Sequence, residues 1–232
     1  MSVLRATDIA KSFRGGDGGI IHVLNGVSLS VARGEMIAIV GASGAGKSTL
    51  LHVMGALDRP SRGEILIDGM SLSDRNEEEL AAIRNKKVGF VFQFHHLLRE
   101  FSALENVAMP LRIGGADIKR ARSRAEELLA RVGLSGRMHH RPNELSGGEQ
   151  QRTAVARALS MDPALLLADE PSGNLDHTTA EMLHDLLAEL ARDLEIAMVV
   201  VTHNRSLASR ADRALLLEDG VLVETDVRGV VT

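Results

Sequence analysis

Cysteine, tryptophan and tyrosine are absent from this chain of 232 residues, and aromatic residues make up only 2% of it. Without cysteine the protein forms neither disulfide bonds nor thiolate metal sites, which is compatible with a reducing compartment. The core therefore has to be built from aliphatic side chains. The longest apolar run, 196–201, is far shorter than the roughly 20 residues that span a bilayer, and the first residues lack the apolar segment of a secretion signal. We expect a chain that does not itself cross a membrane.

The rest of the composition is typical of a globular protein, with 44% hydrophobic and 25% charged residues. A chain of this length can bury a substantial core as one large domain or as a core with a modest insertion. The formal net charge of −4 argues against the broad basic surface needed to bind a phosphate backbone. Nucleic acid is therefore not an expected partner.

Hydrophobic periodicity predicts alternating strands and helices. Short strands fill residues 3–40, broken by a glycine cluster at 15–19 that is typical of a hairpin turn. Apolar strands at 164–170 and 197–203 flank the amphipathic helix 178–194, as buried parallel strands joined by a helix do. The intervening sequence predicts a helix from residue 47, a strand at 64–69, a polar helix at 76–85, a strand at 88–93, and helices within 103–132 that end at Gly133.

These elements predict an α/β fold in which the whole chain, 1–232, is a single domain. Its core comprises about 1–92 and 162–232 and includes an N-terminal antiparallel β subdomain, and residues of about 93–161 form an inserted α-helical subdomain. The last ten residues, 223–232, give no clear signal.

A phosphate-binding loop is predicted where Gly41, Gly46, Lys47 and Ser48 satisfy the pattern G-x-x-x-x-G-K-[ST] between a strand and a helix. Glycines allow backbone N–H groups to converge on phosphate oxygens, and a helix N-terminus favours negative charge. The lysine can reach the β- and γ-phosphates, and the serine can hold Mg²⁺. The alternative is an ordinary strand-to-helix turn that happens to contain these residues.

Two adjacent acids, Asp169 and Glu170, end the apolar strand "LLLAD" and offer the carboxylates that such an enzyme needs. Asp169 is placed to bind Mg²⁺, and Glu170 to act as a general base or to polarise water. The alternative is a pair of solvated acids at a strand end. The apolar strand before them and the phosphate loop favour the catalytic interpretation.

Two other polar residues, His203 and Gln93, also follow strands. In a parallel sheet His203 shares the carboxyl edge with Asp169, where it can hydrogen-bond a γ-phosphate. Gln93 can reach Mg²⁺ or its water; each residue could instead be merely structural or exposed. Adjacent histidines without cysteine or a third ligand are expected to be solvated rather than to bind a transition metal, namely His95 with His96 and His139 with His140.

A second glycine-rich helix entry, "ELSGGEQQR", is the least expected feature of the sequence. Ser146 and Glu149 have the S-x-x-E spacing of a capping box, so the segment predicts a well-capped helix. Glycine nevertheless costs about 1 kcal/mol relative to alanine inside a helix. Bare N–H groups, a hydroxyl and a helix N-terminus form a phosphate site. Because the first loop already binds the phosphates of the chain's own nucleotide, this second site is expected to face a nucleotide held by a second copy of the chain.

Together, "GASGAGKST", Gln93, "LSGGE", "LLLADEPSGNLD" and "VTH" closely resemble, in this order, the ATP-binding cassette of ABC transporters, and the resemblance covers nearly the whole chain. It implies a P-loop NTPase core, ATP and Mg²⁺ as ligands, and a head-to-tail homodimer. It assigns catalysis to Glu170, His203, Lys47 and Gln93, and it makes His203 the switch that responds to the γ-phosphate. Mg²⁺ is assigned to Ser48, Gln93 and Asp169.

The resemblance also implies which residues bind the nucleotide. In one copy they are Phe13, in place of the usual tyrosine that stacks on adenine, and Gly41, Ser43, Gly44, Ala45, Gly46, Lys47, Ser48 and Thr49. In the facing copy they are Ser146, Gly147, Gly148 and, on the loop that crosses the interface, Asp176. Phe13 could equally be a core residue of its strand.

The segment Phe94–Glu105 is where such cassettes contact an integral membrane partner, and its sequence is similar to the ATPases of lipoprotein-releasing transporters of Gram-negative bacteria. Arg99 departs from them, because proline is common there. The resemblance implies a peripheral ATPase at the cytoplasmic face of the bacterial inner membrane, with no direct contact to cargo.

Several alternatives remain open within this resemblance. Macrolide-exporter and cell-division cassettes share part of the segment, and a cassette that only binds ATP is disfavoured by Glu170 and His203. Non-transport ABC ATPases of DNA repair, chromosome structure or translation carry insertions or a second cassette, which this sequence lacks.

Overall fold

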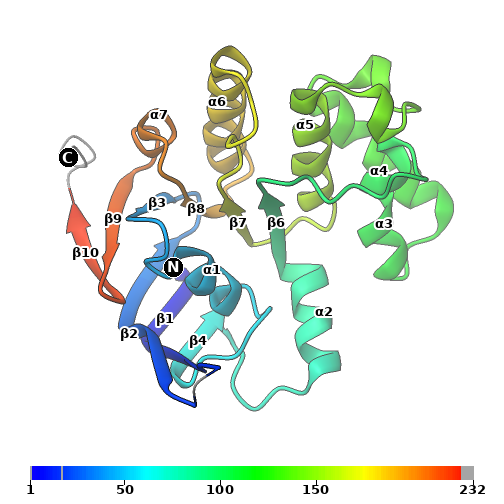
Figure 1. Cartoon of the computed structure of the whole chain (residues 1–232). Coiled ribbons are helices and arrows are strands. Elements are labelled where there is room, and N and C mark those ends of the chain that lie inside the picture. The colour runs from blue at the N-terminus through cyan, green and yellow to red at the C-terminus, as the bar shows by residue number, and fades with distance from the viewer. Residues whose placement is uncertain (1, 17, 226–232) are drawn as a thin grey trace.

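The computed structural model describes residues 2–16 and 18–225. Asp17 of the expected hairpin turn lies outside the described residues. So do residues 226–232, which end the expected second core segment. In chain order the elements are β1 (Ser2–Arg14), β2 (Ile20–Ala32), β3 (Met36–Val40), α1 (Lys47–Met54), β4 (Arg62–Ile67), β5 (Met70–Ser71), α2 (Glu77–Lys87), β6 (Val88–Phe92), α3 (Ala103–Ile113), α4 (Ile118–Arg131), the 3-10 turns η1 (Ser135–Arg137) and η2 (Pro142–Glu144), α5 (Gly147–Ala158), β7 (Leu165–Asp169), α6 (His177–Asp193), β8 (Ala197–Val201), α7 (Arg205–Ala208), β9 (Arg213–Glu218) and β10 (Val221–Thr225) (Figure 1).

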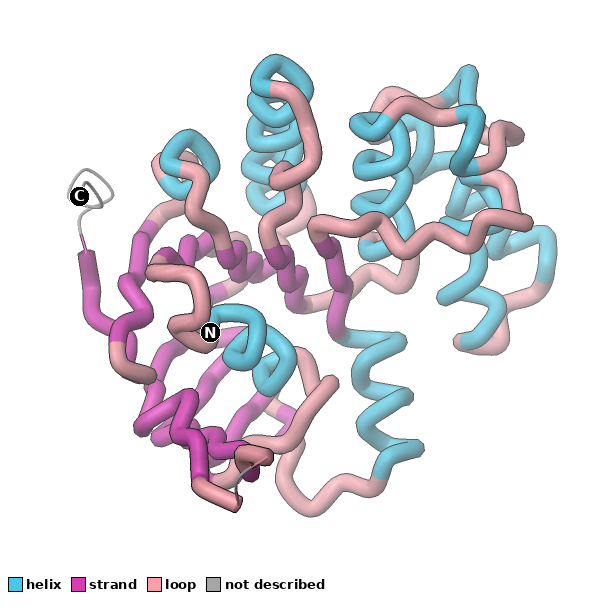
Figure 2. Tube along the Cα trace, in the orientation of Figure 1, coloured by secondary structure: helices cyan, strands magenta, loops and turns pink. Residues whose placement is uncertain are grey.

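Two sheets form the centre of the α/β fold, as the sequence predicts. The antiparallel sheet has the order β2-β1-β4-β5, and the larger sheet has the order β10-β9-β3-β8-β7-β6. From β9 to β6 all neighbours of the larger sheet are parallel, and β10 pairs antiparallel with β9. Helices α3, α4 and α5 gather on one side of the molecule, away from the antiparallel sheet (Figure 2).

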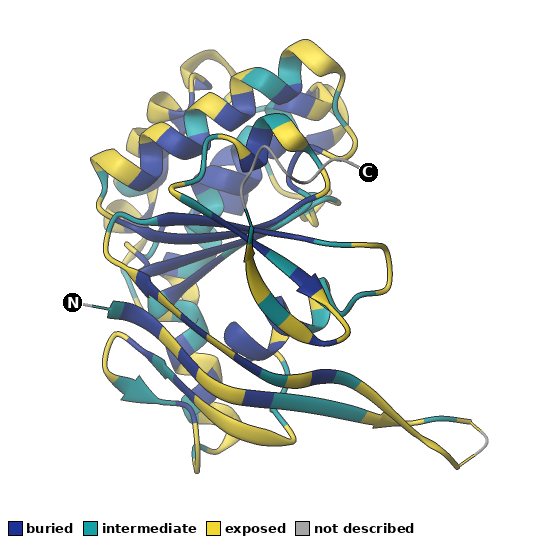
Figure 3. Ribbon diagram, turned by 90° about the vertical axis from the view of Figure 1, so that its left-hand side faces the viewer, coloured by how far each residue is buried: buried dark blue, intermediate teal, exposed yellow. Residues whose placement is uncertain are grey.

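The larger sheet separates two aliphatic cores, which explains why its strands are continuously apolar. Leu165 and Leu167 of β7 pack into the core shared with the antiparallel sheet, α1 and α2. Leu166 and Ala168 point to the opposite face and pack with α3, α4, α5 and α6. Figure 3 shows the buried strands of the sheet between these two layers.

The parallel register brings the expected site residues to one edge of the sheet. Ile39, Val201, Asp169 and Phe92 form a row across β3, β8, β7 and β6. The next residues along each strand therefore emerge together, where open α/β sheets bind ligands.

Helix ends follow the predicted capping chemistry. Asn76, Ser102 and Ser146 each form a reciprocal capping box with a glutamate three residues later. Gly133, with φ of 75°, follows the end of α4 as predicted. Within the part of the chain that the structure describes, no helix combines the length and apolarity required to span a bilayer.

Strands β9 and β10 and helix α7 lie where the sequence analysis predicts no element. The apolar stretch in β9 is only "ALLL", too short to distinguish a strand from a helix by its periodicity. Its strand conformation is set by parallel pairing with β3, which is distant in the sequence.

Candidate functional site

The phosphate loop connects β3 to α1, as the sequence predicts. Gly46, the residue before α1, has φ of 97°, and a Cβ there would lie 2.8 Å from the Val23 side chain, so only glycine fits. The Lys47 ammonium donates to the carbonyls of Gly41 and Ala42, each at 2.9 Å. The remaining predicted residues, Ser43, Gly44, Ala45, Ser48 and Thr49, lie in the same loop or the first turn of α1.

Glu170 lies directly after β7 and is held by residues that follow β8. Its Oε1 accepts from the backbone N–H of His203 at 3.0 Å and lies 2.7 Å from His203 Nδ1. Its Oε2 accepts from the Thr202 hydroxyl at 3.0 Å. The Glu170 side chain is 18% exposed, whereas that of His203 is 78% exposed. The carboxylate fixes the Nδ1 proton and leaves Nε2 of His203 for another contact.

Gln93, immediately after β6, contacts the loop that follows Glu170. Its amide nitrogen donates to the Asn174 side chain at 3.0 Å, and Asn174 donates back to the Gln93 carbonyl at 3.1 Å. Gly173 lies so close that a Cβ there would be 2.8 Å from the Gln93 amide nitrogen. The structure therefore brings Gln93, Glu170 and His203 to one edge.

Two of the residues predicted to bind Mg²⁺, Asp169 and Ser48, lie at the end of β7 and in the helix packed against it. Asp169 is the last residue of β7, and Ser48 is in the first turn of α1, which packs against β7 and β8. Among the described residues, neither the Asp169 carboxylate nor the Ser48 hydroxyl has a hydrogen-bond or ion-pair partner. Hydroxyl and carboxylate oxygens that are not used internally fit Mg²⁺.

The serine-glycine segment begins α5, and its capping box is formed as predicted. The Ser146 hydroxyl accepts from the Glu149 N–H at 3.2 Å, and Glu149 accepts from the Ser146 N–H at 2.8 Å. Ser146 and Gly147 are exposed. In Figure 1, α5 and α1 lie well apart, with β6 and β7 between them. The two predicted phosphate loops of one chain therefore do not meet.

The two glycines of this segment differ in their surroundings. A Cβ on the buried Gly148 would lie 2.3 Å from the Thr179 methyl of α6, whereas one on Gly147 would meet only Leu175, at 3.7 Å. Internal packing therefore explains the absence of a side chain at Gly148 but not at Gly147. Asp176 also has a structural role within its own chain, because it caps α6 by accepting from the Thr179 N–H at 3.0 Å.

The remaining predicted residues fall on the surface, with one exception. Phe13 on β1 is 43% exposed, so its interpretation as a core residue is wrong. The expectation that His95 is solvated is also wrong. The residue is half-buried, its Nε2 atom is shielded from solvent, and burial lowers the pKa of His95. His96 and His139 are exposed, and His140 is intermediate.

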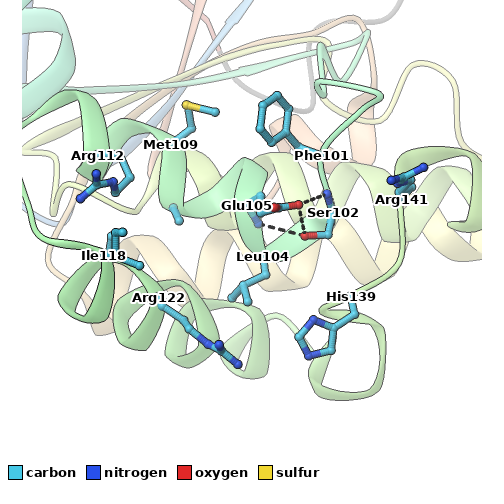
Figure 4. Close-up of a pocket in the computed structure, with 12 residues that line it drawn as sticks. Phe101, Ser102, Leu104, Glu105, Met109, Arg112, Ile118, Arg122, His139 and Arg141 are labelled. Atoms are coloured by element: carbon cyan, nitrogen blue, oxygen red, sulfur yellow. Dashed lines mark hydrogen bonds between the residues drawn. The ribbon is translucent and has the colours of Figure 1, made fainter.

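A groove of about 570 Å³ lies beside the end of the predicted partner segment (Figure 4). Phe101, Leu104 and Glu105 line it from the segment and α3, and Ile118 and Arg122 line it from α4. Glu105 is fixed by Ser102, whose hydroxyl donates to its carboxylate at 2.7 Å. The groove wall is thus apolar with charged margins.

Two residues at the site were missed by the sequence analysis. Thr202 bonds Glu170, and Asn174 bonds Gln93. Thr202 lies in the motif "VTH" and Asn174 in "SGNLD", so their positions in the sequence marked them as candidates. The sequence did not show that their side chains point toward Glu170 and Gln93.

The fold and the residues at this sheet edge define a P-loop nucleotide-binding protein, in which a second glycine-rich helix N-terminus begins α5. Residues 24–173 match the ABC transporter family, and the chain belongs to that family as an ATPase of the ABC type.

Close relatives and a solved structure agree with this assignment. Two proteins called lipoprotein-releasing system ATP-binding protein LolD are similar to the chain. That of Desulfotalea psychrophila is 52% identical over 224 residues, covering 97% of this chain and 100% of the relative. That of Bordetella pertussis is 56% identical over 202 residues, covering 87% of each. The dimeric post-hydrolysis structure of the ATP-binding cassette MJ0796, bound to ADP and Pi, has a TM-score of 0.87 and 40% identity, covering 97% of this chain and 99% of that one.

Proposed function

We propose that this chain is the ATPase subunit of a lipoprotein-releasing transporter and that it hydrolyses ATP as a head-to-tail homodimer. The observation that carries the proposal is the separation of α1, which begins at Lys47, from α5, which begins at Gly147 after the exposed N-cap Ser146 (Figure 1). A phosphate held by Lys47 of one copy can reach these groups only in a second copy. The dimeric state of the MJ0796 cassette supports this arrangement.

Each ATP site between the two copies combines residues with different roles. Lys47 and the loop N–H groups bind the β- and γ-phosphates, and Phe13 stacks on adenine. Glu170 accepts the proton of the attacking water, while Thr202 and the His203 N–H hold its carboxylate in place. His203 contacts the γ-phosphate through Nε2, the ring nitrogen that Glu170 does not contact. Asp176 approaches the neighbouring copy beside Ser146 and Gly147.

Ser48, Asp169 and Gln93 would hold Mg²⁺. The ion would neutralise charge on the β- and γ-phosphate oxygens.

The groove beside Phe101 and Leu104 receives a cytoplasmic helix of an integral membrane partner. Its apolar wall and charged margins suit an amphipathic helix. The names of the two LolD relatives support lipoprotein release as the work of the complex. The chain is then peripheral at the cytoplasmic face of the inner membrane and does not touch cargo. Residues 93–161 would act as the helical subdomain that transmits ATP binding to the partners.

Steady-state hydrolysis by the wild type and Glu170→Gln tests the catalytic assignment. The amide keeps the shape of the side chain but cannot accept a proton, so turnover should be lost while an ATP-bound dimer accumulates. Size-exclusion chromatography with ATP measures the dimer. An unchanged rate would reject the role of Glu170.

A further inference from the structure

His184 is a fully buried histidine in the middle of α6 and has no part in the reaction proposed above. Its Nε2 lies 2.8 Å from the Ser172 hydroxyl. Its Nδ1 lies 3.4 Å from Oε1 of Glu181, one turn earlier on the helix, and the ring is 0% exposed. Burial lowers the pKa of His184, which keeps the ring neutral.

The groups around the ring determine which nitrogen accepts. Glu181 is fixed as a carboxylate, because its Oε2 accepts from the Ser206 hydroxyl at 2.8 Å and from Arg210 at 2.9 Å, and Ser206 lowers its pKa. A carboxylate facing Nδ1 favours the proton on that nitrogen. Nε2 is then the acceptor, and the Ser172 hydroxyl donates to it. The other charged group nearby, Asp185, is paired with Arg210.

Ser172 is a central residue of the turn that carries Glu170. The Gly173 N–H donates to the Glu170 carbonyl at 3.0 Å, with Pro171 and Ser172 between them. Glu170 has φ of 44°, in the left-handed region that is strained for a residue with a side chain. Such strain persists only where surrounding contacts hold it. The Ser172–His184 hydrogen bond is a contact of this kind, made from the side of α6.

We propose that His184 is a positioning residue for Glu170: by accepting the Ser172 hydroxyl, it holds the strained turn in the conformation that aims the Glu170 carboxylate. It does not touch the nucleotide. This inference rests on the proposed role of Glu170. The anchoring of Glu181 by Ser206 also ties the same cluster to α7, three residues after His203.

The test is a double-mutant cycle in ATP hydrolysis by the full chain, using His184→Phe, Ser172→Ala and the double variant. Loss of one buried hydrogen bond should lower kcat about fivefold in each single variant, the equivalent of about 1 kcal/mol at 1.36 kcal/mol per factor of ten. KM for ATP should change less than about twofold, since no residue that binds ATP is altered. The kcat of the double variant should be no more than about twofold below that of either single variant.

Two further variants separate positioning from general damage to the fold. His184→Gln keeps a polar group near the place of Nε2 and should retain most of the wild-type kcat. Ser160→Ala removes another buried serine, whose hydroxyl has no hydrogen-bond partner in the described chain, and should leave kcat unchanged. If His184→Phe does not fold, Ser172→Ala alone decides, and a wild-type kcat in it overturns the inference.

Wild-type kcat in both single variants, or a roughly 25-fold loss in the double variant, would also overturn it. Glu170→Gln is measured alongside. Retained turnover there means that the proposed function fails, whereas lost turnover there with normal Ser172→Ala means that only the role of His184 fails.

Discussion

The neighbouring glycines Gly147 and Gly148 allow folding and function to be tested separately. A methyl group at Gly148 would lie 2.3 Å from the Thr179 methyl, which cannot easily rotate away because the Thr179 hydroxyl and N–H both bond Asp176. Overpacking of this kind costs about 1–3 kcal/mol. Alanine gains up to about 1 kcal/mol in helix propensity at either position. Because this gain is common to both, Gly148→Ala should be about 1–3 kcal/mol less stable than Gly147→Ala.

Urea unfolding of the nucleotide-free protein measures this difference, and ATP hydrolysis measures the second effect. Gly147→Ala should be as stable as the wild type or slightly more stable, yet it should lose at least about tenfold in hydrolysis, because the methyl group obstructs the partner's phosphate. Adding Thr179→Ser to Gly148→Ala removes the clash, keeps the hydroxyl bond to Asp176 and should restore stability. Equal stability of the two alanine variants would refute the steric reasoning, and full hydrolysis by Gly147→Ala would refute the second phosphate site.

Three further predictions concern other parts of the chain. Lys47→Ala should abolish the thermal stabilisation by ATP seen with the wild type, while the melting temperature without ATP changes by only a few degrees; an unchanged ATP shift would contradict the phosphate loop. The Ser146 N–H lowers the pKa of Glu149 below 4.5, the ordinary value of a glutamate. The Glu149 carboxylate therefore stabilises the folded protein fully above that pH, and this stabilisation is lost as the pH falls through the lowered pKa. Glu149→Gln should therefore flatten the acid limb of a stability–pH curve, and an identical limb would count against the capping box. Phe101→Glu should prevent co-purification with membrane partners from detergent extract, unlike the exposed control Ile113→Glu at the end of α3; equal recovery would reject the groove.

Local chemistry made much of the fold and site predictable. The phosphate loop, the acids at the end of β7 and the capping box at Ser146 each depend on residues within a few positions of one another, and the structure places each of them where this spacing predicts. The α/β class followed from apolar strands that are buried on both faces.

Contacts between distant segments could not be predicted in this way. The apolar stretch of β9 is too short to identify it, and its pairing with β3 supplies the missing information. The fit of Gly148 against Thr179 depends on the approach of α5 to α6, and His184 meets Ser172 only after α6 packs on the sheet. The sequence presents these residues as an ordinary helix start and an ordinary amphipathic helix.

Hydrolysis per chain as a function of protein concentration tests the central claim most directly, with the oligomeric state followed by light scattering in the same samples. If two copies complete each other's sites, the rate per chain should fall toward zero as the protein dilutes to a monomer. A monomer that hydrolyses ATP at the full rate would contradict the account.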